Sequence, residues 1–182
     1  MARVAALAGR RIDAADAASP RFPLANVERV RERLQTLLRA GGSAALACSA
    51  ACGADLIALD VAGTLGLRRR VVLPFRPERF RETSVTDRPG DWGGLFDRII
   101  GAVAATGDVV ILGLDESDDA TYAAANDAIL NEAEGLAGGD PSEVVAVVVW
   151  EGASRGEGDL TEAFATAARA RGHPVREVLT TV

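Results

Sequence analysis

Hydrophobic residues along the chain follow two patterns that alternate from one end to the other. The run at residues 144–149 is apolar throughout and mostly β-branched, as in strands that are covered on both faces of a parallel sheet. Between Val27 and Leu38, by contrast, apolar residues recur every three or four positions among Arg and Glu, which predicts an amphipathic helix. The pattern therefore indicates strands alternating with helices.

The same two patterns assign the remaining elements. Strands are predicted at residues 3–8, 44–48, 70–73, 108–112, 143–150 and 174–179. Helices are predicted at residues 26–40, 54–65, 92–105, 118–137 and 160–171. Because such a series pairs in parallel through right-handed crossovers, the sequence predicts an α/β fold, a three-layer doubly wound Rossmann-like domain with a mostly parallel sheet. Residues 1–182 show no linker or internal repeat, so a single domain is expected.

Two segments fit neither pattern. Residues 14–24 carry two prolines and are predicted to form a long loop. Residues 75–91 hold too many Arg, Pro and polar residues for a buried element, and a loop of this length is typical of a lid or a binding loop. Asn26 and Asp159 precede predicted helices and are expected to cap them.

The charged and metal-binding residues exclude several function classes. All 20 basic residues are Arg, which excludes a Schiff-base or P-loop lysine. With one His and two Cys, the chain lacks the ligands of a multi-histidine or zinc site, so neither a metal nor a cofactor is expected. The net charge of -6 argues against general nucleic-acid binding.

The composition also favours one compartment. Two cysteines and no N-terminal signal segment fit a reducing cytoplasm. No apolar run approaches the roughly 20 residues that cross a membrane, so no membrane contact is expected. We therefore expect a cytoplasmic protein.

Two glycine-containing loops follow predicted strands and precede predicted helices, namely SAACGAD at 49–55 and EGASRGEGDLT at 151–161. Glycine lets the backbone approach a ligand, and a helix N-terminus favours a phosphate. Both loops lie at the strand carboxyl ends, where doubly wound sheets bind ligands. Alternatively, the glycines only let a strand turn into a helix. The predicted ligand-binding residues are Gly9, Arg10, Arg11, Ser49, Gly53, Ala54, Asp55, Glu151, Gly152, Arg155, Gly156, Gly158, Asp159 and Thr161.

Several of these side chains have a functional and a structural interpretation. Arg155 can grip a phosphate through its planar fork, or lie exposed on the loop. Glu151 can accept from a base or ribose hydroxyl, or pair with an Arg. Asp55 can orient a ribose, or cap the helix that begins beside it. Trp150 can stack on a base, although core packing is its ordinary role.

A resemblance adds to this interpretation. The run SAACGADLIALDVAGTLGLRRRVVLPF resembles the nucleotide-binding loop of the SLOG superfamily, which joins DprA/Smf DNA-processing proteins with LOG phosphoribohydrolases. The run VVVWEGASRGEGDLTEAFATAARARGHPV resembles DprA-like sequences. LOG enzymes carry a P-G-G-x-G-T-x-x-E loop that supplies a catalytic Glu, whereas this chain has R-G-E-G-D-L-T-E, in which Gly156, Gly158, Thr161 and Glu162 have rough counterparts.

The leading hypothesis is a domain that binds a nucleotide or a nucleotide-derived ligand at the strand carboxyl ends, as a sensor or regulatory module. The alternative is a LOG-like phosphoribohydrolase or N-glycosidase that acts on nucleoside monophosphates, with Glu151, Glu162 or Asp55 as catalytic candidates. Because LOG-like folds often form dimers, the resemblance also implies a homodimer as a third possibility.

Overall fold

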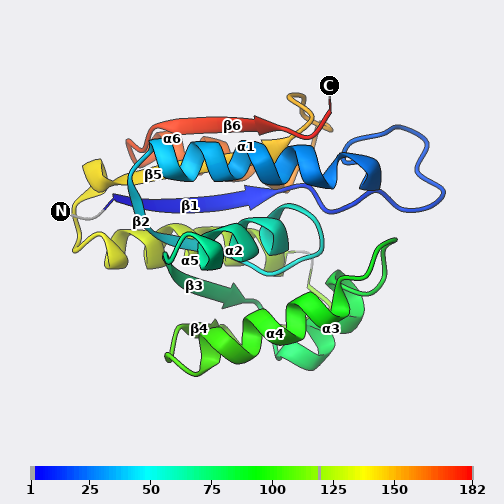
Figure 1. Cartoon of the computed structure of the whole chain (residues 1–182), viewed down its shortest axis with the longest axis horizontal. Helices are drawn as coiled ribbons and strands as arrows, with labels where there is room; N and C mark the ends of the chain where they lie inside the picture. Colours follow the sequence, from blue (N-terminus) through cyan, green and yellow to red (C-terminus); the bar gives the residue numbers. More distant parts are fainter. Residues whose placement is uncertain (1–2, 119, 182) are drawn as a thin grey trace.

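The computed structural model describes residues 3–118 and 120–181, and in these residues six parallel strands form one sheet in the order β4-β3-β2-β1-β5-β6. Figure 1 shows the strands in this order, from β6 at the top to β4 at the bottom. Their bounds are β1 (Arg3–Gly9), β2 (Ser43–Cys48), β3 (Arg68–Leu73), β4 (Val109–Ile111), β5 (Val144–Trp150) and β6 (Val175–Leu179). The α/β fold predicted from the pattern is confirmed.

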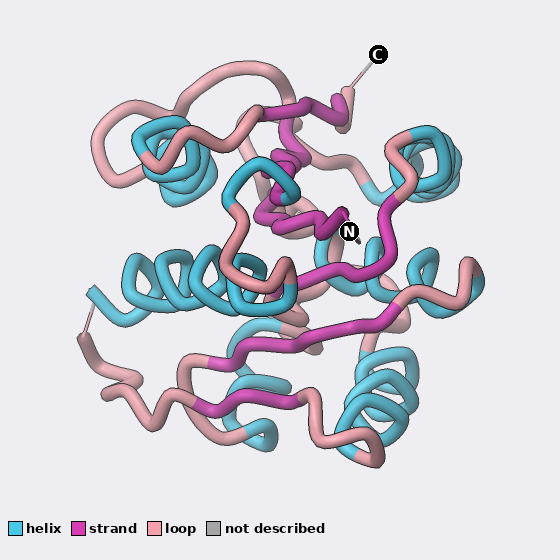
Figure 2. The backbone as a smooth tube through the Cα atoms, turned by 90° about the vertical axis from the view of Figure 1, so that its left-hand side faces the viewer, coloured by secondary structure: helices cyan, strands magenta, loops and turns pink. Residues whose placement is uncertain are grey.

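Helices cover both faces of the sheet, as Figure 2 shows. One face packs against α1 (Val27–Ala40), α2 (Ala54–Thr64) and α4 (Gly93–Ala104). The other packs against α5 (Ala120–Leu136) and α6 (Leu160–Ala170). Two short 3-10 helices, Leu24–Asn26 and Pro141–Glu143, precede α1 and β5. The predicted three layers are therefore present.

The strand order reverses between β1 and β5. The chain leaves β1 through α1 to reach β2 on one side, and it returns from β4 through α5 to reach β5 on the other side. In a parallel α/β sheet the crevice outside the strand carboxyl ends at such a reversal is the usual place for a ligand. The fold thus directs attention to the end of β1.

The end of β1 lies unusually close to the start of α2. A Cβ atom on Gly9 would stand 2.5 Å from Ala54 Cβ and 2.7 Å from Val149 Cβ, so no larger residue fits. At Gly53 the backbone has φ 98°, and a Cβ would meet the Arg10 carbonyl oxygen at 2.8 Å. These two glycines let the loop after β1 and the loop before α2 share one wall.

The prediction for residues 75–91 was wrong, because the segment contains α3 (Pro77–Ser84) with Phe80 and Ser84 buried. Pro77 at the first turn suits a helix start, since its missing N–H has no partner there in any helix. The arginines that argued against a buried element pair at the surface. Arg79 bridges to Glu116 at 2.8 Å, and Arg81 bridges to Asp97 at 2.9 Å.

The two predicted N-caps had different outcomes. Asp159 caps α6, because its carboxylate accepts from the Thr161 and Glu162 N–H groups. Asn26 precedes α1 but makes no side-chain cap there, and its Nδ2 donates instead to the Thr180 carbonyl oxygen at 2.9 Å. Residue 119 of the predicted helix 118–137 lies outside the described residues.

In the part of the chain that the structure describes, the helices are too short or too polar for one of them to span a membrane.

Candidate functional site

A cavity of about 380 Å³ opens at the strand carboxyl ends, where the strand order reverses. Its walls come from the end of β1, the loop after β2, α3, α5, and the start of α6. Apolar walls are formed by Leu7, Ala8, Ile12, Ala51, Pro74, Phe80, Ala125, Ile129 and Leu160. Polar groups are contributed by Arg10, Arg11, Asp13, Arg21, Ser49, Asp55, Ser84, Arg88, Tyr122, Asn126, Arg155 and Thr161.

Asp55 is a buried carboxyl in the cavity wall. It stands in the first turn of α2, and its Oδ2 accepts from the Ala51 N–H at 3.1 Å, so the side chain ties the preceding loop rather than capping the helix. Burial raises the pKa of Asp55 to about 7, although the Ala51 N–H and the charge of Arg11 each oppose this rise. The cap interpretation was wrong, and the carboxyl titrates where a general acid or base would.

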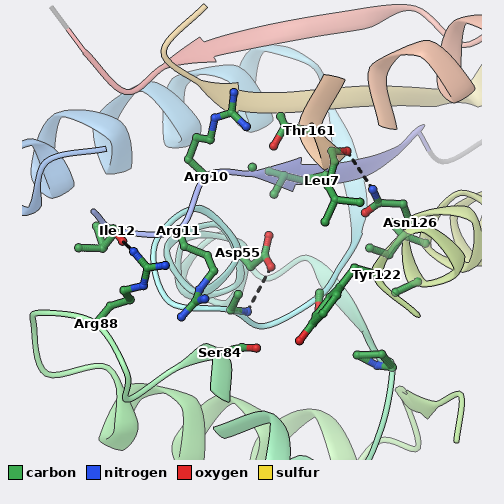
Figure 3. Close-up of a pocket in the computed structure, with 18 of the residues that line it drawn as sticks. Leu7, Arg10, Arg11, Ile12, Asp55, Ser84, Arg88, Tyr122, Asn126 and Thr161 are labelled. Carbon is green, nitrogen blue, oxygen red and sulfur yellow. Dashed lines mark hydrogen bonds between the residues drawn. The ribbon is translucent and has the colours of Figure 1, made fainter. Parts of the chain in front are cut away.

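Three other polar side chains of the cavity wall come from distant segments of the chain. In the view of Figure 3 its carboxyl lies between Arg11 and Tyr122, with Ser84 below. The Tyr122 ring meets Phe75 edge to face, with centroids 6.4 Å apart. The Cys52 N–H donates to the Ser84 carbonyl oxygen at 2.9 Å, which fixes the end of α3 against the loop before α2.

The far wall joins two helices of the other layer. Asn126 on α5 donates from Nδ2 to the Leu160 carbonyl oxygen at 2.9 Å, as the dashed line in Figure 3 shows. Thr161 on α6 is buried beside it. The cavity therefore has walls from both helical layers.

Arg10 lines the cavity, but carboxylates take up its guanidinium. Its Nε donates to Glu151 at 2.7 Å, and Nη1 and Nη2 donate to Asp159 at 2.7 and 2.8 Å. The guanidinium also lies 5.7 Å from the centre of the Trp150 ring, and only 4% of its side chain is exposed. We call Arg10, Glu151 and Asp159 the Arg10 network.

The Arg10 network decides the role of Glu151. Burial acts to raise the pKa of Glu151, but the hydrogen bonds from Arg10, from its own backbone N–H and from Arg21, together with the charge of Arg10, hold that pKa below its ordinary value. Arg21 adds a second contact at 3.0 Å. Glu151 is thus an ionised partner of two arginines, as the structural interpretation had it. Trp150 packs in the core, with its indole N–H donating to Glu177 at 3.1 Å.

Asp159 occupies the position predicted for a phosphate at the start of α6. Its carboxylate accepts from the N–H groups of Arg155, Thr161 and Glu162 at 2.7, 2.9 and 3.2 Å. Burial acts to raise its pKa, but the Arg10 contact and these donors hold the pKa well below the ordinary value. The helix end is therefore already neutralised by an internal anion.

The structure brings together one half of the predicted residues and separates the other. Gly9, Arg10, Arg11, Ser49, Asp55, Arg155 and Thr161 line the cavity. The remaining predicted residues lie outside its lining, and these are Gly53, Ala54, Glu151, Gly152, Gly156, Gly158, Asp159 and Glu162. Three of them, Gly152, Gly156 and Gly158, have positive φ and are exposed, which fits a turning role. Glu162 is exposed too and bonds to Ser154.

Several lining residues were not among the predicted ligand-binding residues, and these include Asp13, Arg21, Ser84 and Arg88. Arg88 follows α3, in the segment whose Arg and Pro content indicated a lid or a binding loop, so a signal for it existed. Ser84 lies in the same segment, but nothing singled it out there, because a lone Ser among polar residues cannot be distinguished from a solvated one.

The fold and the cavity define a doubly wound, Rossmann-like α/β protein with a ligand-sized site at the strand carboxyl ends. No protein-family model matches the chain, and no curated protein matches it in sequence. Across residues 3–118 and 120–181, no group of three His, Cys, Asp or Glu side chains is placed to hold a metal ion.

Proposed function

We propose that the cavity binds a nucleoside phosphate or a nucleotide-derived ligand, as a sensor or regulatory module. One observation carries the proposal: arginines and one buried carboxyl face a single cavity at the point where the strand order reverses. A volume of about 380 Å³ is within the range of ligand sites, which run from about 300 to 1,000 Å³.

The two kinds of wall suit the two parts of a nucleotide. The ring of Tyr122 and the side chains of Leu7 and Ile129 offer apolar surface for a base. Asp55, when protonated, both donates and accepts, so it can pair with a base edge or a ribose hydroxyl. Arg155, whose side chain is 44% exposed and keeps only a long contact of 3.8 Å from Nε to Asp159, can turn toward a phosphate.

Calorimetric titration with nucleoside mono-, di- and cyclic phosphates tests this proposal. We expect binding that weakens about tenfold or more in Arg155→Ala, since a charged hydrogen bond contributes about 1.5–3 kcal/mol. Arg169→Ala is the matched control, because Arg169 is exposed on α6 outside the cavity. Absence of binding at millimolar ligand, or equal loss in both variants, contradicts the proposal.

A second candidate is hydrolysis of an N-glycosidic bond, and the raised pKa of Asp55 favours it. Of the three catalytic candidates, Asp55 alone lines the cavity, whereas Glu151 is held ionised by Arg10 and Glu162 lies outside. Chromatography of a nucleoside monophosphate incubated with the protein decides this point. Free base released by the wild type but not by Asp55→Asn supports hydrolysis, and unchanged substrate supports a sensor.

We further propose a cytoplasmic location and association into a homodimer. Cys48 and Cys52 are buried as free thiols, which suits a reducing compartment. Ile111, 50% exposed on the edge strand β4, is the side chain a second copy would cover. Light scattering at two concentrations checks the dimer, and a constant monomer mass contradicts it.

A further inference from the structure

Two cavity arginines from distant segments share one carboxylate. Arg11 follows β1, Arg88 belongs to the segment 85–92 between α3 and α4, and both line the cavity. Asp87 stands between them, since its Oδ1 accepts from Nη2 of Arg11 and its Oδ2 lies 3.7 Å from Nε of Arg88. The carboxylate thus occupies the position that an anion held by both guanidiniums would take.

Neither guanidinium is fully used by this arrangement. Among the described residues Arg11 Nε is buried without a hydrogen-bond partner, which is costly for a charged donor. Arg88 has a long contact from Nη1 to the Ile12 carbonyl oxygen, 3.5 Å away and drawn in Figure 3. The Arg10 network, by comparison, fills all three nitrogens of its guanidinium with contacts of 2.7–3.2 Å.

A phosphate matches this pair of arginines better than Asp87 does. It offers more acceptor oxygens than a carboxylate and a charge near -2, and a planar guanidinium can bind two of those oxygens at once. The Asp87 contacts are also partly open to solvent, because 29–34% of the side chains of Arg11, Asp87 and Arg88 is exposed. An incoming phosphate can therefore replace the carboxylate without crossing the core.

We propose that Arg11 and Arg88 form a phosphate subsite of the cavity, and that Asp87 is an internal competitor which a phosphate must displace. The subsite depends on the proposed function in one respect only, namely that the phosphate which it binds belongs to a nucleotide. Displacement of Asp87 breaks the contact between residue 11 and the segment 85–92, so occupancy of the cavity is transmitted to the surface at that segment.

The test is a titration with inorganic phosphate and, separately, with a nucleoside monophosphate, followed by amide chemical shifts. We expect Asp87→Asn to tighten both about three- to fivefold, the size expected when a partly exposed ion pair no longer competes. Arg11→Gln and Arg88→Gln should each weaken both about tenfold. In the double variant Asp87→Asn with Arg11→Gln, the gain from Asp87→Asn should disappear, because the competed group is gone.

Asp91→Asn is the matched control, since Asp91 is exposed in the same segment and its substitution removes the same charge. Two outcomes would assign the effect to general charge and overturn the subsite. One is an equal gain of phosphate affinity in Asp91→Asn, and the other is a gain from Asp87→Asn that survives in the Arg11→Gln background. Thermal unfolding shows whether each variant folds, and Arg88→Gln replaces Arg11→Gln if the latter does not.

The outcomes separate the subsite from the proposed function. If phosphate binds with this dependence but the monophosphate binds no more tightly, the subsite stands and nucleotide recognition fails. If the monophosphate binds and depends on Arg155 but not on residues 11, 87 and 88, the subsite fails and the proposed function stands. If neither ligand shifts a resonance in any variant at millimolar concentration, both are overturned.

Discussion

Two buried carboxyls of this fold respond to burial in opposite ways. Asp159 is held ionised, because Arg10 and three backbone N–H groups surround it. Asp55 has one backbone donor and, among the described residues, no basic side chain within ion-pairing distance, so burial dominates and raises its pKa to about 7. The balance between burial and the donors around each carboxyl separates a structural anion from a titrating group.

This difference predicts the pH dependence of Asp55→Asn. The pKa of Asp55 in the folded protein lies above the unfolded value. Its contribution to wild-type stability is therefore fully present below about pH 4 and is lost as the pH rises toward 7. The variant cannot ionise, and its amide oxygen can still accept from Ala51. We expect its free energy of unfolding to exceed that of the wild type by about 2–4 kcal/mol at pH 8 and to differ little from it at pH 4.

Urea unfolding of both proteins between pH 4 and 8.5 measures this effect. Asp91→Asn, which exchanges the same residue type at an exposed position outside the cavity lining, serves as the control and should follow the wild-type profile. Parallel profiles for wild type and Asp55→Asn would contradict a titrating Asp55.

The Arg10 network predicts a large loss of stability in Arg10→Gln. Removal of the guanidinium leaves two carboxylates with 0% and 12% side-chain exposure, and only the more exposed Arg21 and Arg155 remain beside them. Breaking a buried pair in this way costs about 3–5 kcal/mol. Arg39→Gln, on the exposed end of α1, should change the free energy of unfolding by less than about 0.5 kcal/mol. Denaturant unfolding at pH 7 compares the two, and similar midpoints would show that the network adds no stability.

Individual residue roles were harder to predict than the elements that carry them. Asp159 was recognised as a cap because the residue directly before a helix has one ordinary task. Asp55 is the second residue of α2, where a side chain can turn toward the helix or toward the preceding loop. The sequence does not show which of the two directions it takes. The partners of Arg10 lie 141 and 149 residues away, so no local pattern could show that its charge was already taken.

At the level of elements, the contact between the end of β1 and the start of α2 predicts the effect of Gly53→Ala. The Gly53 backbone has φ 98°, and the added Cβ would meet the Arg10 carbonyl oxygen and the Ile12 nitrogen at 2.8 Å. Gly66→Ala is the control, because Gly66 has φ 71° with nothing within 4 Å. We expect the control to cost about 1 kcal/mol for its backbone conformation and Gly53→Ala clearly more, because backbone must move.

Thermal unfolding of the two glycine variants measures that difference. If Gly53→Ala and Gly66→Ala lose the same stability, the close approach of the two loops is soft and contributes nothing to the shape of the cavity. A larger loss in Gly53→Ala, accompanied by weaker ligand binding, would show that the wall shared by these loops shapes the site.

Strands and helices with a clear hydrophobic pattern were predictable from the sequence, whereas α3 was not. Strands such as β5 bury a continuous β-branched run, so the signal of each is local. Within α3, Phe80 and Ser84 are buried while the arginines around them pair with acids on other elements. The charge that looked like a solvated loop is neutralised by tertiary contacts, which a pattern read along the chain does not contain.

For the molecule as a whole, the cavity unites walls that no single element provides. Its lining draws on β1 of the sheet, on α2 and α3 from one side of it, and on α5 and α6 from the other. A ligand held there contacts both helical layers, and these must separate when the chain unfolds. Binding should therefore stabilise the whole cooperative unit and not only a local loop.

A saturating nucleoside monophosphate should then raise the melting temperature of the protein. At a concentration 100 times Kd, binding adds about 2.7 kcal/mol, which for a chain of this size corresponds to about 5–10 °C. Hydrogen exchange should slow in α2, α5 and α6 together, because global unfolding is what the ligand opposes. At the same ligand concentration, Arg155→Ala should lose about half of the thermal shift or more, since its binding is about tenfold weaker or more, while Arg169→Ala keeps the full shift. Protection confined to the loop at residues 151–159, with no rise in melting temperature, would instead place the ligand on the glycine loop outside the cavity.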